Sequence, residues 1–178
     1  MKTSGPKTKE ALIQSALTLF EKKGISNVSV DTITKAANVA KGSFYTHFKN
    51  RADFLIYLHR DFHEKLKLEI TKGIQNQPFG MERLWIGTET YLNYCLSNSS
   101  MKSFLFEARI EPALTKEVSN RNREFSIWAE KDFAKAGWEY TQATASLYVG
   151  MIAETAIQEM KAKKKLQNLR NAIAQFID

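Results

Sequence analysis

The chain has 178 residues, of which 43% are hydrophobic and 25% are charged, and its formal net charge is +7. This length is enough for one or two domains with a buried core. The single cysteine, Cys95, excludes an intrachain disulfide, and the longest apolar run, Leu147 to Ala153, is too short for a membrane span. The first ten residues lack the apolar segment of a secretory signal, so we expect a cytoplasmic protein.

The positive charge is concentrated in the N-terminal part of the chain. Residues 1–51 contain eight Lys and one Arg against three acidic residues, a net charge of +6, whereas the remaining residues carry only +1. Such a basic segment is typical of nucleic-acid binding. A solvated basic face that aids solubility explains the charge equally well when the charge is considered alone.

Apolar residues recur at helical spacing along most of the chain, and strand signals are scarce. The sequence therefore predicts an all-α protein of about nine helices. The first helix is expected from Lys7 to Lys23, with Leu12, Ala16 and Phe20 on one face and Gly24 as its C-terminal stop. This helix is expected to support the segment that follows it.

The stretch from Val28 to Arg51 predicts two short helices, a tight turn and the start of a longer helix. Ser29 is suited to cap the first helix, and Asn38 tolerates the left-handed backbone at which that helix ends. The second helix is expected over residues 41–47, and Asn50 is suited to cap the third. This is a helix-turn-helix layout, whose second helix enters the DNA major groove.

Three segments carry a family resemblance: Phe20–Gly24 (FEKKG), Val30–Ile33 (VDTI) and Ala37–Phe48 (ANVAKGSFYTHF). They resemble the TetR family of bacterial transcriptional regulators, and the run KGSFY-x-HF is specific to it. The family usually has Gly at the position of Asn38 and Ser or Thr at the position of Ala40. The second difference removes a hydroxyl cap from the recognition helix, which typically costs ~0.5–2 kcal/mol.

The resemblance implies that the helix beginning at Lys41 reads DNA. Lys41 is expected to contact a base edge, because Lys pairs with guanine acceptors. Tyr45 and His47 are expected to contact phosphates, whereas Phe44 and Phe48 should face the core. The predicted DNA-binding residues are Ser29, Thr32, Lys41, Gly42, Ser43, Tyr45, His47, Lys49 and Arg51.

The pattern divides the chain into a helix-turn-helix domain over residues 1–50 and a helical ligand-binding and dimerisation domain over residues 51–178. A long helix is expected from Arg51 to Ile74, followed by a polar linker over residues 75–80. Further helices are expected over residues 81–96, 101–110, 113–135 and 139–161, with a final helix after them.

In the family, a small molecule binds among the helices of the second domain and releases the DNA. Aromatic content and one carboxylate in an apolar helix suggest a pocket for such an effector, although large apolar residues at helical spacing are usually core. The candidate ligand-binding residues are Phe62, Trp85, Tyr91, Phe104, Phe125, Trp128, Tyr148, Met151 and Glu154.

The last two helices predict a dimer interface. The helix over residues 139–161 is apolar nearly all round and carries a row of mostly small residues, which suits close packing against another helix. We expect a homodimer joined by a four-helix bundle, against the alternative of a purely intrachain core. The predicted interface residues are Ala143, Ser146, Gly150, Ala153, Ile157, Leu166, Leu169, Ile173 and Phe176.

No enzyme signature is visible in the sequence, and no cofactor is expected. His59 and His63 have metal-ligand spacing on one helix, but a site needs three or four ligands, so no metal is expected. The prediction is a dimeric TetR-type regulator, most simply a repressor, that binds a palindromic operator in double-stranded DNA and responds to a small molecule. The alternatives are a ligand-independent nucleoid or division factor and an all-α interaction module that does not bind DNA.

Overall fold

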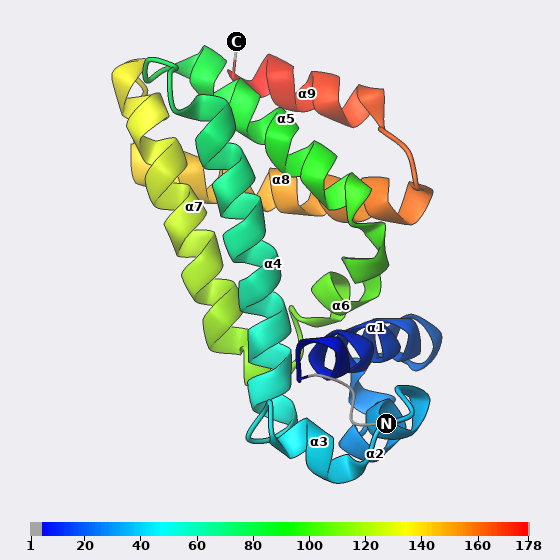
Figure 1. The fold of residues 1–178 in the computed structure, drawn as a ribbon. Coiled ribbons are helices and arrows are strands. Elements are labelled where there is room, and N and C mark those ends of the chain that lie inside the picture. Colours follow the sequence, from blue (N-terminus) through cyan, green and yellow to red (C-terminus); the bar gives the residue numbers. More distant parts are fainter. Residues whose placement is uncertain (1–4, 178) are drawn as a thin grey trace. The chain divides into compact units, whose positions relative to one another are not determined.

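The computed structural model describes residues 5–177, in which helices are joined by turns and short loops and there is no strand (Figure 1). This confirms the predicted all-α class with about nine helices. The elements of this part of the chain are α1 (Gly5–Lys23), η1 (Ile25–Asn27), α2 (Val30–Ala36), α3 (Lys41–Tyr45), α4 (Arg51–Ile74), α5 (Met81–Ser97), η2 (Ser99–Met101), α6 (Lys102–Glu107), η3 (Pro112–Leu114), α7 (Thr115–Lys135), α8 (Thr141–Ala162) and α9 (Gln167–Ile177), where η denotes a 3-10 helix.

The chain forms two compact units that do not follow the sequence continuously. The first unit extends to Asp61 and resumes from Ser100 to Glu117, whereas the second contains residues 62–99 and the chain from Val118 onward. Helix α4 therefore begins in one unit and ends in the other. The division at residue 50 expected from the sequence stays a prediction.

Aromatic side chains hold α6 against α1 in the first unit. Phe20 and Phe104 are both buried, and their rings stack with centroids 5.8 Å apart. The carboxylate of Glu107 accepts a hydrogen bond of 2.6 Å from the backbone amide of Ile25, at the start of η1. Gly24 precedes this amide at φ +77°, and a Cβ there would lie 3.0 Å from Glu107 Oε2. Gly24 is therefore required both by its backbone conformation and by the close carboxylate.

The second unit contains a buried ion pair that joins α8 to α9. Glu159 and Arg170 are 0% and 1% exposed, and the guanidinium Nε and Nη2 atoms each donate to one carboxylate oxygen at 2.7 Å. The backbone amide of Leu166 donates to the same carboxylate at 2.9 Å, and Arg170 Nη1 donates to Asn93 of α5 at 3.0 Å. The pair thus fixes three helices and the α8–α9 connection.

Candidate functional site

The helix-turn-helix of the first unit has the predicted local geometry. Ser29 caps α2 by accepting from the Thr32 amide at 3.2 Å, and the Thr32 side chain accepts from the Ser29 amide at 3.0 Å. Asn38 adopts the left-handed backbone expected of it, at φ +53°. Ala40 is the N-cap of α3 and provides no side-chain hydrogen bond. The hydroxyls of Ser29 and Thr32 are therefore occupied in capping α2, whereas α3 starts without a side-chain cap.

One side of α3 is anchored in an aromatic cluster. Phe44 is fully buried, and its ring lies 5.4 Å from that of Phe48 and 5.5 Å from that of Phe54, between centroids. The rings of Phe48 and Phe54 meet edge to face at 4.8 Å. These contacts fix the rotation of α3 about its axis and thereby decide which residues face outward.

The opposite side of α3 is open to solvent. Tyr45 is 51% exposed, Lys41 and Gly42 are exposed, and Ser43 and His47 are half-buried. A Cβ added at Gly42 would meet no atom within 4 Å, so the chain itself does not require glycine there. A partner whose surface approaches the backbone closely would require it.

Two predicted cations of this region have partners within the first unit. Lys41 forms an ion pair of 2.7 Å with Asp31, and both side chains are more than half exposed. The hydrogen bond from Lys41 lowers the pKa of Asp31, and the same bond raises the pKa of Lys41. An exposed pair of this kind is weak, so Lys41 remains available to an external partner.

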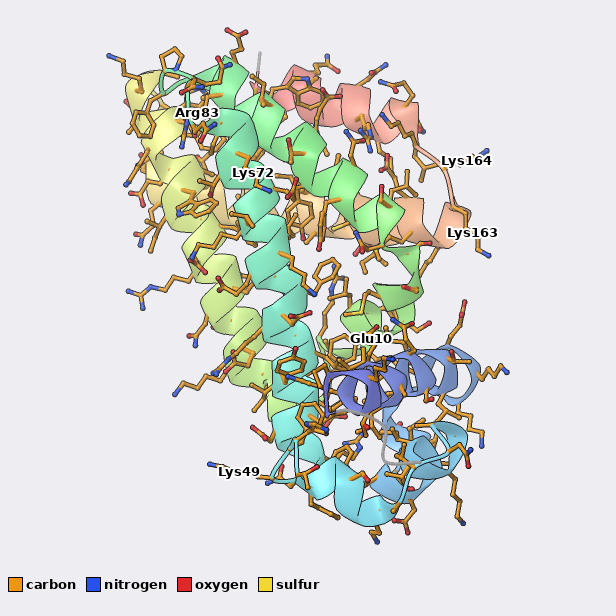
Figure 2. All side chains as sticks on the ribbon, in the orientation of Figure 1. Glu10, Lys49, Lys72, Arg83, Lys163 and Lys164 are labelled. Carbon is orange, nitrogen blue, oxygen red and sulfur yellow. The ribbon has the colours of Figure 1, made fainter. Side chains whose placement is uncertain are left out.

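Arg51 has an internal role that the sequence did not indicate. Its Nε donates to the carbonyl of Val28 at 2.9 Å, and its Nη2 donates to that of Ile25 at 2.5 Å. Glu111 lies 3.7 Å from Nη1. Arg51 thus supports the loop that precedes α2. Lys49, in contrast, is exposed, and its side chain extends away from the ribbon (Figure 2).

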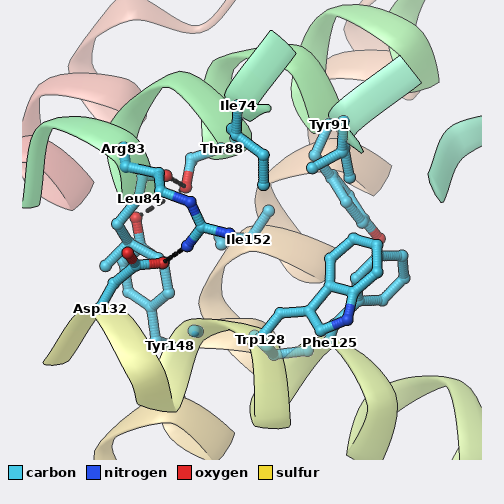
Figure 3. Close-up of a pocket in the computed structure, with 14 residues that line it drawn as sticks. Ile74, Arg83, Leu84, Thr88, Tyr91, Phe125, Trp128, Asp132, Tyr148 and Ile152 are labelled. Carbon is cyan, nitrogen blue, oxygen red and sulfur yellow. Dashed lines mark hydrogen bonds and ion pairs between the residues drawn. The ribbon is translucent and has the colours of Figure 1, made fainter. Parts of the chain in front are cut away.

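The second unit contains an apolar cavity of about 60 Å³ between α4, α5, α7 and α8 (Figure 3). Its walls are mainly aliphatic and aromatic. The lining residues are Ile70, Ile74, Arg83, Leu84, Gly87, Thr88, Tyr91, Phe125, Trp128, Ala129, Asp132, Tyr148, Val149 and Ile152. A larger hollow of about 290 Å³, lined by exposed and half-buried residues, shares Ile74, Arg83 and Trp128 with this cavity, so the two are neighbours across these three side chains.

Polar groups in the cavity wall satisfy one another. The Thr88 hydroxyl donates to the carbonyl of Leu84 at 2.9 Å and lies 2.8 Å from the Tyr148 hydroxyl. Since the one Thr88 proton is used by Leu84, Tyr148 donates to Thr88. Burial raises the pKa of Tyr148 to about 12, so this hydroxyl stays protonated and keeps its hydrogen bond.

An ion pair stands where the cavity meets the outer hollow. Arg83 Nη1 lies 2.5 Å from Asp132 Oδ2, and the two side chains point toward one another in Figure 3. Asp132 is buried, and its other oxygen accepts from the amide of Gly80 at 3.0 Å. The Phe79 ring lies 4.3 Å from the Arg83 guanidinium on the outer side.

Four of the nine predicted ligand-binding residues line this cavity: Tyr91, Phe125, Trp128 and Tyr148. The other five lie elsewhere. Phe104 belongs to the first unit, where it packs on Phe20, because residues 100–117 fold with that unit. Phe62 contacts Tyr94, while Trp85 and Met151 are half-buried and Glu154 is exposed on α8. Sequence reasoning missed Arg83 and Asp132, whose pairing joins residues far apart in the chain.

The predicted interface residues separate into an exposed and a buried group. On α8, Ala143, Ser146 and Gly150 are exposed, and Ala153 is half-buried. On α9, Phe176 is exposed and Leu169 is half-buried, as is Leu166 in the connection just before this helix. Ile157 and Ile173 are buried within the chain itself, so they already serve its core. Leu147, which the prediction did not include, is 70% exposed on the same side of α8 as the small residues.

Among residues 5–177, no group of three or more His, Cys, Asp or Glu side chains is placed to hold a metal ion. His59 and His63 are both buried. Burial raises the pKa of the Cys95 thiol to about 12, which makes this buried side chain an inert core residue. No helix in the described residues is both long and apolar enough to cross a bilayer.

Several known proteins with related sequences are described as transcriptional regulators or repressors. Residues 12–58 match the family model of bacterial regulatory proteins, tetR family. The chain is 38% identical over 138 residues to the uncharacterized HTH-type transcriptional regulator YwcC of Bacillus subtilis, which is 74% of this chain and 62% of YwcC. It is 30% identical over 93 residues to the probable acrEF/envCD operon repressor of Escherichia coli K12, which is 49% of this chain and 42% of that repressor.

The chain thus spans less than two thirds of these curated relatives. The structural comparison covers nearly the whole chain. The fatty acid degradation regulator FadR of Bacillus halodurans superposes with a TM-score of 0.81 at 20% identity, over 99% of this chain and 96% of that protein.

Together, the matched segment over residues 12–58 and the fold define a helix-turn-helix protein with a second helical unit. Residues 12–58 match the TetR family model, and the chain shares its fold with a putative TetR-family transcriptional regulator from Syntrophomonas wolfei, at a TM-score of 0.80 and 15% identity over 96% of this chain and 93% of that chain. The resemblance seen in the sequence is thereby confirmed.

Proposed function

We propose that this protein is a DNA-binding transcriptional regulator that contacts the major groove through α3. The observation that carries this function is the division of α3 into a side anchored by Phe44 and a side that presents Lys41, Gly42 and Tyr45 to solvent. The tetR-family match over residues 12–58 supports the same reading, because it contains the whole helix-turn-helix. Lys49 adds a cation beside this surface, where it would meet phosphate.

Tyr45→Ala is expected to weaken binding to the DNA that flanks the gene by about tenfold or more. A hydrogen bond from a neutral donor to a charged phosphate is worth about 1.5–3 kcal/mol. The measurement is fluorescence anisotropy with a labelled fragment at two salt concentrations. Wild-type affinity should fall steeply with salt, because phosphate binding releases counterions.

Tyr140→Ala is the matched control, because it removes another exposed tyrosine from a different part of the chain. It should bind the fragment as the wild type does. Equal, weak binding of wild type and Tyr45→Ala to unrelated DNA would favour the nucleoid factor instead. An affinity for DNA that does not change with salt, or no binding to any DNA fragment, would favour the all-α interaction module.

We propose that two copies of the chain act together through α8 and α9 on a palindromic operator. The exposed side of α8 combines three small residues with Leu147, and a Cβ added at Gly150 would meet no atom within 4 Å. A glycine inside a helix destabilises it by roughly 0.5–1 kcal/mol relative to alanine, so its presence at an open position favours close approach by a partner helix. Half-sites would lie about 34–36 Å apart or at multiples of this spacing.

Leu147→Glu is expected to convert the dimer into a monomer, because a carboxylate would be buried without a partner at the centre of the interface. Sedimentation velocity measures the mass directly. Leu68→Glu is the control, since Leu68 is an exposed leucine on α4. A monomeric wild-type protein, or a dimer that persists in Leu147→Glu, would contradict this interface.

The regulator is further proposed to respond to a small molecule that enters the cavity between α4, α5, α7 and α8. Repression is the direction that we propose, and the relative from Escherichia coli K12 is described as a probable repressor. Addition of the effector should then release the DNA fragment in the same anisotropy measurement. The shift depends only on the difference in its affinity for the two states of the protein.

A further inference from the structure

The inner cavity offers a ligand almost only apolar surface. Tyr148 donates to Thr88 and Thr88 donates to the Leu84 carbonyl, so neither hydroxyl has a spare proton to donate. The remaining walls are chiefly Ile70, Ile152 and Trp128. At about 60 Å³ the cavity is small beside the about 300–1,000 Å³ of drug-sized pockets and has room for roughly two groups of about 30 Å³ each, the size of a water molecule. This volume favours a short hydrocarbon segment over a long chain or a bulky ring system.

Gly87 forms part of the cavity wall, although its helical backbone conformation does not require glycine. It lies inside α5, and a Cβ there would sit 3.6 Å from Ile74 and 3.7 Å from Ile70, an ordinary contact distance. Alanine would strengthen the helix by roughly 0.5–1 kcal/mol. The absence of a side chain therefore leaves space in the cavity at a cost in helix stability, which is consistent with a wall that a ligand contacts.

The outer hollow differs from the cavity in its charge. Arg83 and Lys131 both line it, and its other polar residues are neutral: Thr71, Gln75 and Gln77. Asp132 balances the charge of Arg83, since the two are paired at 2.5 Å, and Lys131 adds a further positive charge on the exposed side. An anionic group in this hollow would be attracted by Lys131 and would share the guanidinium of Arg83 with Asp132.

We propose that the effector is an apolar acid, with its hydrocarbon tail in the inner cavity and its anionic head group in the outer hollow beside Arg83 and Lys131. This inference rests on the proposed ligand-responsive function and names the chemical class of the ligand. A carboxylate and a phosphate share the relevant chemistry. Arg83 lies at the junction of the two spaces, so it contacts the head group while the tail passes Ile74 and Trp128.

The test measures binding to the full chain without DNA, by isothermal titration calorimetry with four probes of equal tail length. Butanoate and butyl phosphate represent the two acids, butan-1-ol lacks charge, and butyltrimethylammonium reverses it. At least one acid should bind, and at least tenfold more tightly than the alcohol or the cation. Butanoate binding alone would assign the head group to a carboxylate, and butyl phosphate binding alone would assign it to a phosphate.

Three variants locate the site. Lys131→Gln should weaken binding of the preferred acid several-fold, and Lys135→Gln, on the exposed surface of α7, should leave it unchanged. Gly87→Ala should weaken it at least threefold without lowering the melting temperature. The double variant Arg83→Gln/Asp132→Asn removes both charges together, which avoids a buried unpaired carboxylate, and should weaken binding at least tenfold.

Preference for the cation or the alcohol, or failure of every probe to bind, would overturn the inference. Equal acid binding by wild type, Lys131→Gln and Gly87→Ala would overturn it as well. DNA binding is measured separately with the flanking fragment. Loss of acid binding together with intact, Tyr45-dependent DNA binding would reject the ligand class and leave the regulator in place.

Discussion

Glu159→Gln is expected to lower the free energy of unfolding by about 3–5 kcal/mol, because it leaves the buried guanidinium of Arg170 with only the partly exposed Glu89, 4.0 Å from its Nη1, as a countercharge. The carboxylate is fully buried and accepts three hydrogen bonds, two from Arg170 and one from the Leu166 amide. Urea denaturation followed by circular dichroism measures the loss. Glu69→Gln is the control, because Glu69 pairs with Lys72 on the surface and should lose less than about 1 kcal/mol.

The same carboxylate predicts a pH dependence. Burial raises the pKa of Glu159, but the hydrogen bonds from Arg170 and from the Leu166 amide outweigh this effect and hold it below the ordinary value of 4.5. Since the pKa is lower in the folded state, this stabilisation is fully present above pH 4.5 and is lost as the pH falls through the folded value. The difference in stability between wild type and Glu159→Gln should therefore shrink in acid.

A second variant distinguishes this ion pair from general packing. Glu159→Gln/Arg170→Met removes the uncompensated charge and should recover part of the lost stability. A double variant less stable than Glu159→Gln would contradict the proposed cause, as would a difference between wild type and Glu159→Gln that does not change with pH.

Phe44→Ala is expected to cost about 3–5 kcal/mol of unfolding free energy, because it opens a cavity between two other buried rings. Phe44 contacts both Phe48 and Phe54, with centroids 5.4 Å and 5.5 Å away. The variant should therefore lower the melting temperature of the first unit and, as a consequence, reduce DNA binding. Thermal denaturation by circular dichroism, with DNA binding measured below the transition, checks both effects.

The neighbouring residue provides the control. Tyr45 is 51% exposed and touches Phe44 only through a ring edge, so Tyr45→Ala should keep nearly the wild-type melting temperature while DNA binding falls. A Phe44→Ala variant as stable as Tyr45→Ala would contradict the role of the aromatic cluster in fixing α3.

Local signals in the sequence predicted much of the fold. Helix α4 spans Arg51–Ile74, the predicted bounds, because its start is marked by a cap: the Asp53 amide donates to Asn50 Oδ1 at 2.9 Å and the Asp53 carboxylate accepts from the Lys49 amide at 3.0 Å. The turn at Asn38 and the uncapped start at Ala40 were also predicted, since a single residue determines each. Helix periods and caps depend on neighbours a few positions away, which a sequence displays directly.

Long-range pairing accounts for what sequence reasoning missed. Arg83 and Asp132 are 49 positions apart, and Arg51 donates to Ile25, 26 positions away. Periodicity identifies a charged residue as exposed by default, so it gives no sign that a partner on another helix will neutralise it. The sequence predicts that aromatic residues line a cavity, but it does not determine which of them do. Phe104 is an example, because its segment packs in the other unit.

The return of residues 100–117 to the first unit limits how far the DNA-binding segment can serve as a transferable module. A chimera that joins only residues 1–50 to an unrelated protein would lack Phe104, which covers Phe20, and Glu107, which binds the amide of Ile25. Engineering of a new regulator from this chain should therefore replace residues 62–99 and the chain from Val118 onward with a foreign ligand-binding unit, and retain both pieces of the first unit. Recombination within a genome faces the same restriction, because such an exchange needs breakpoints near residues 61, 99 and 117.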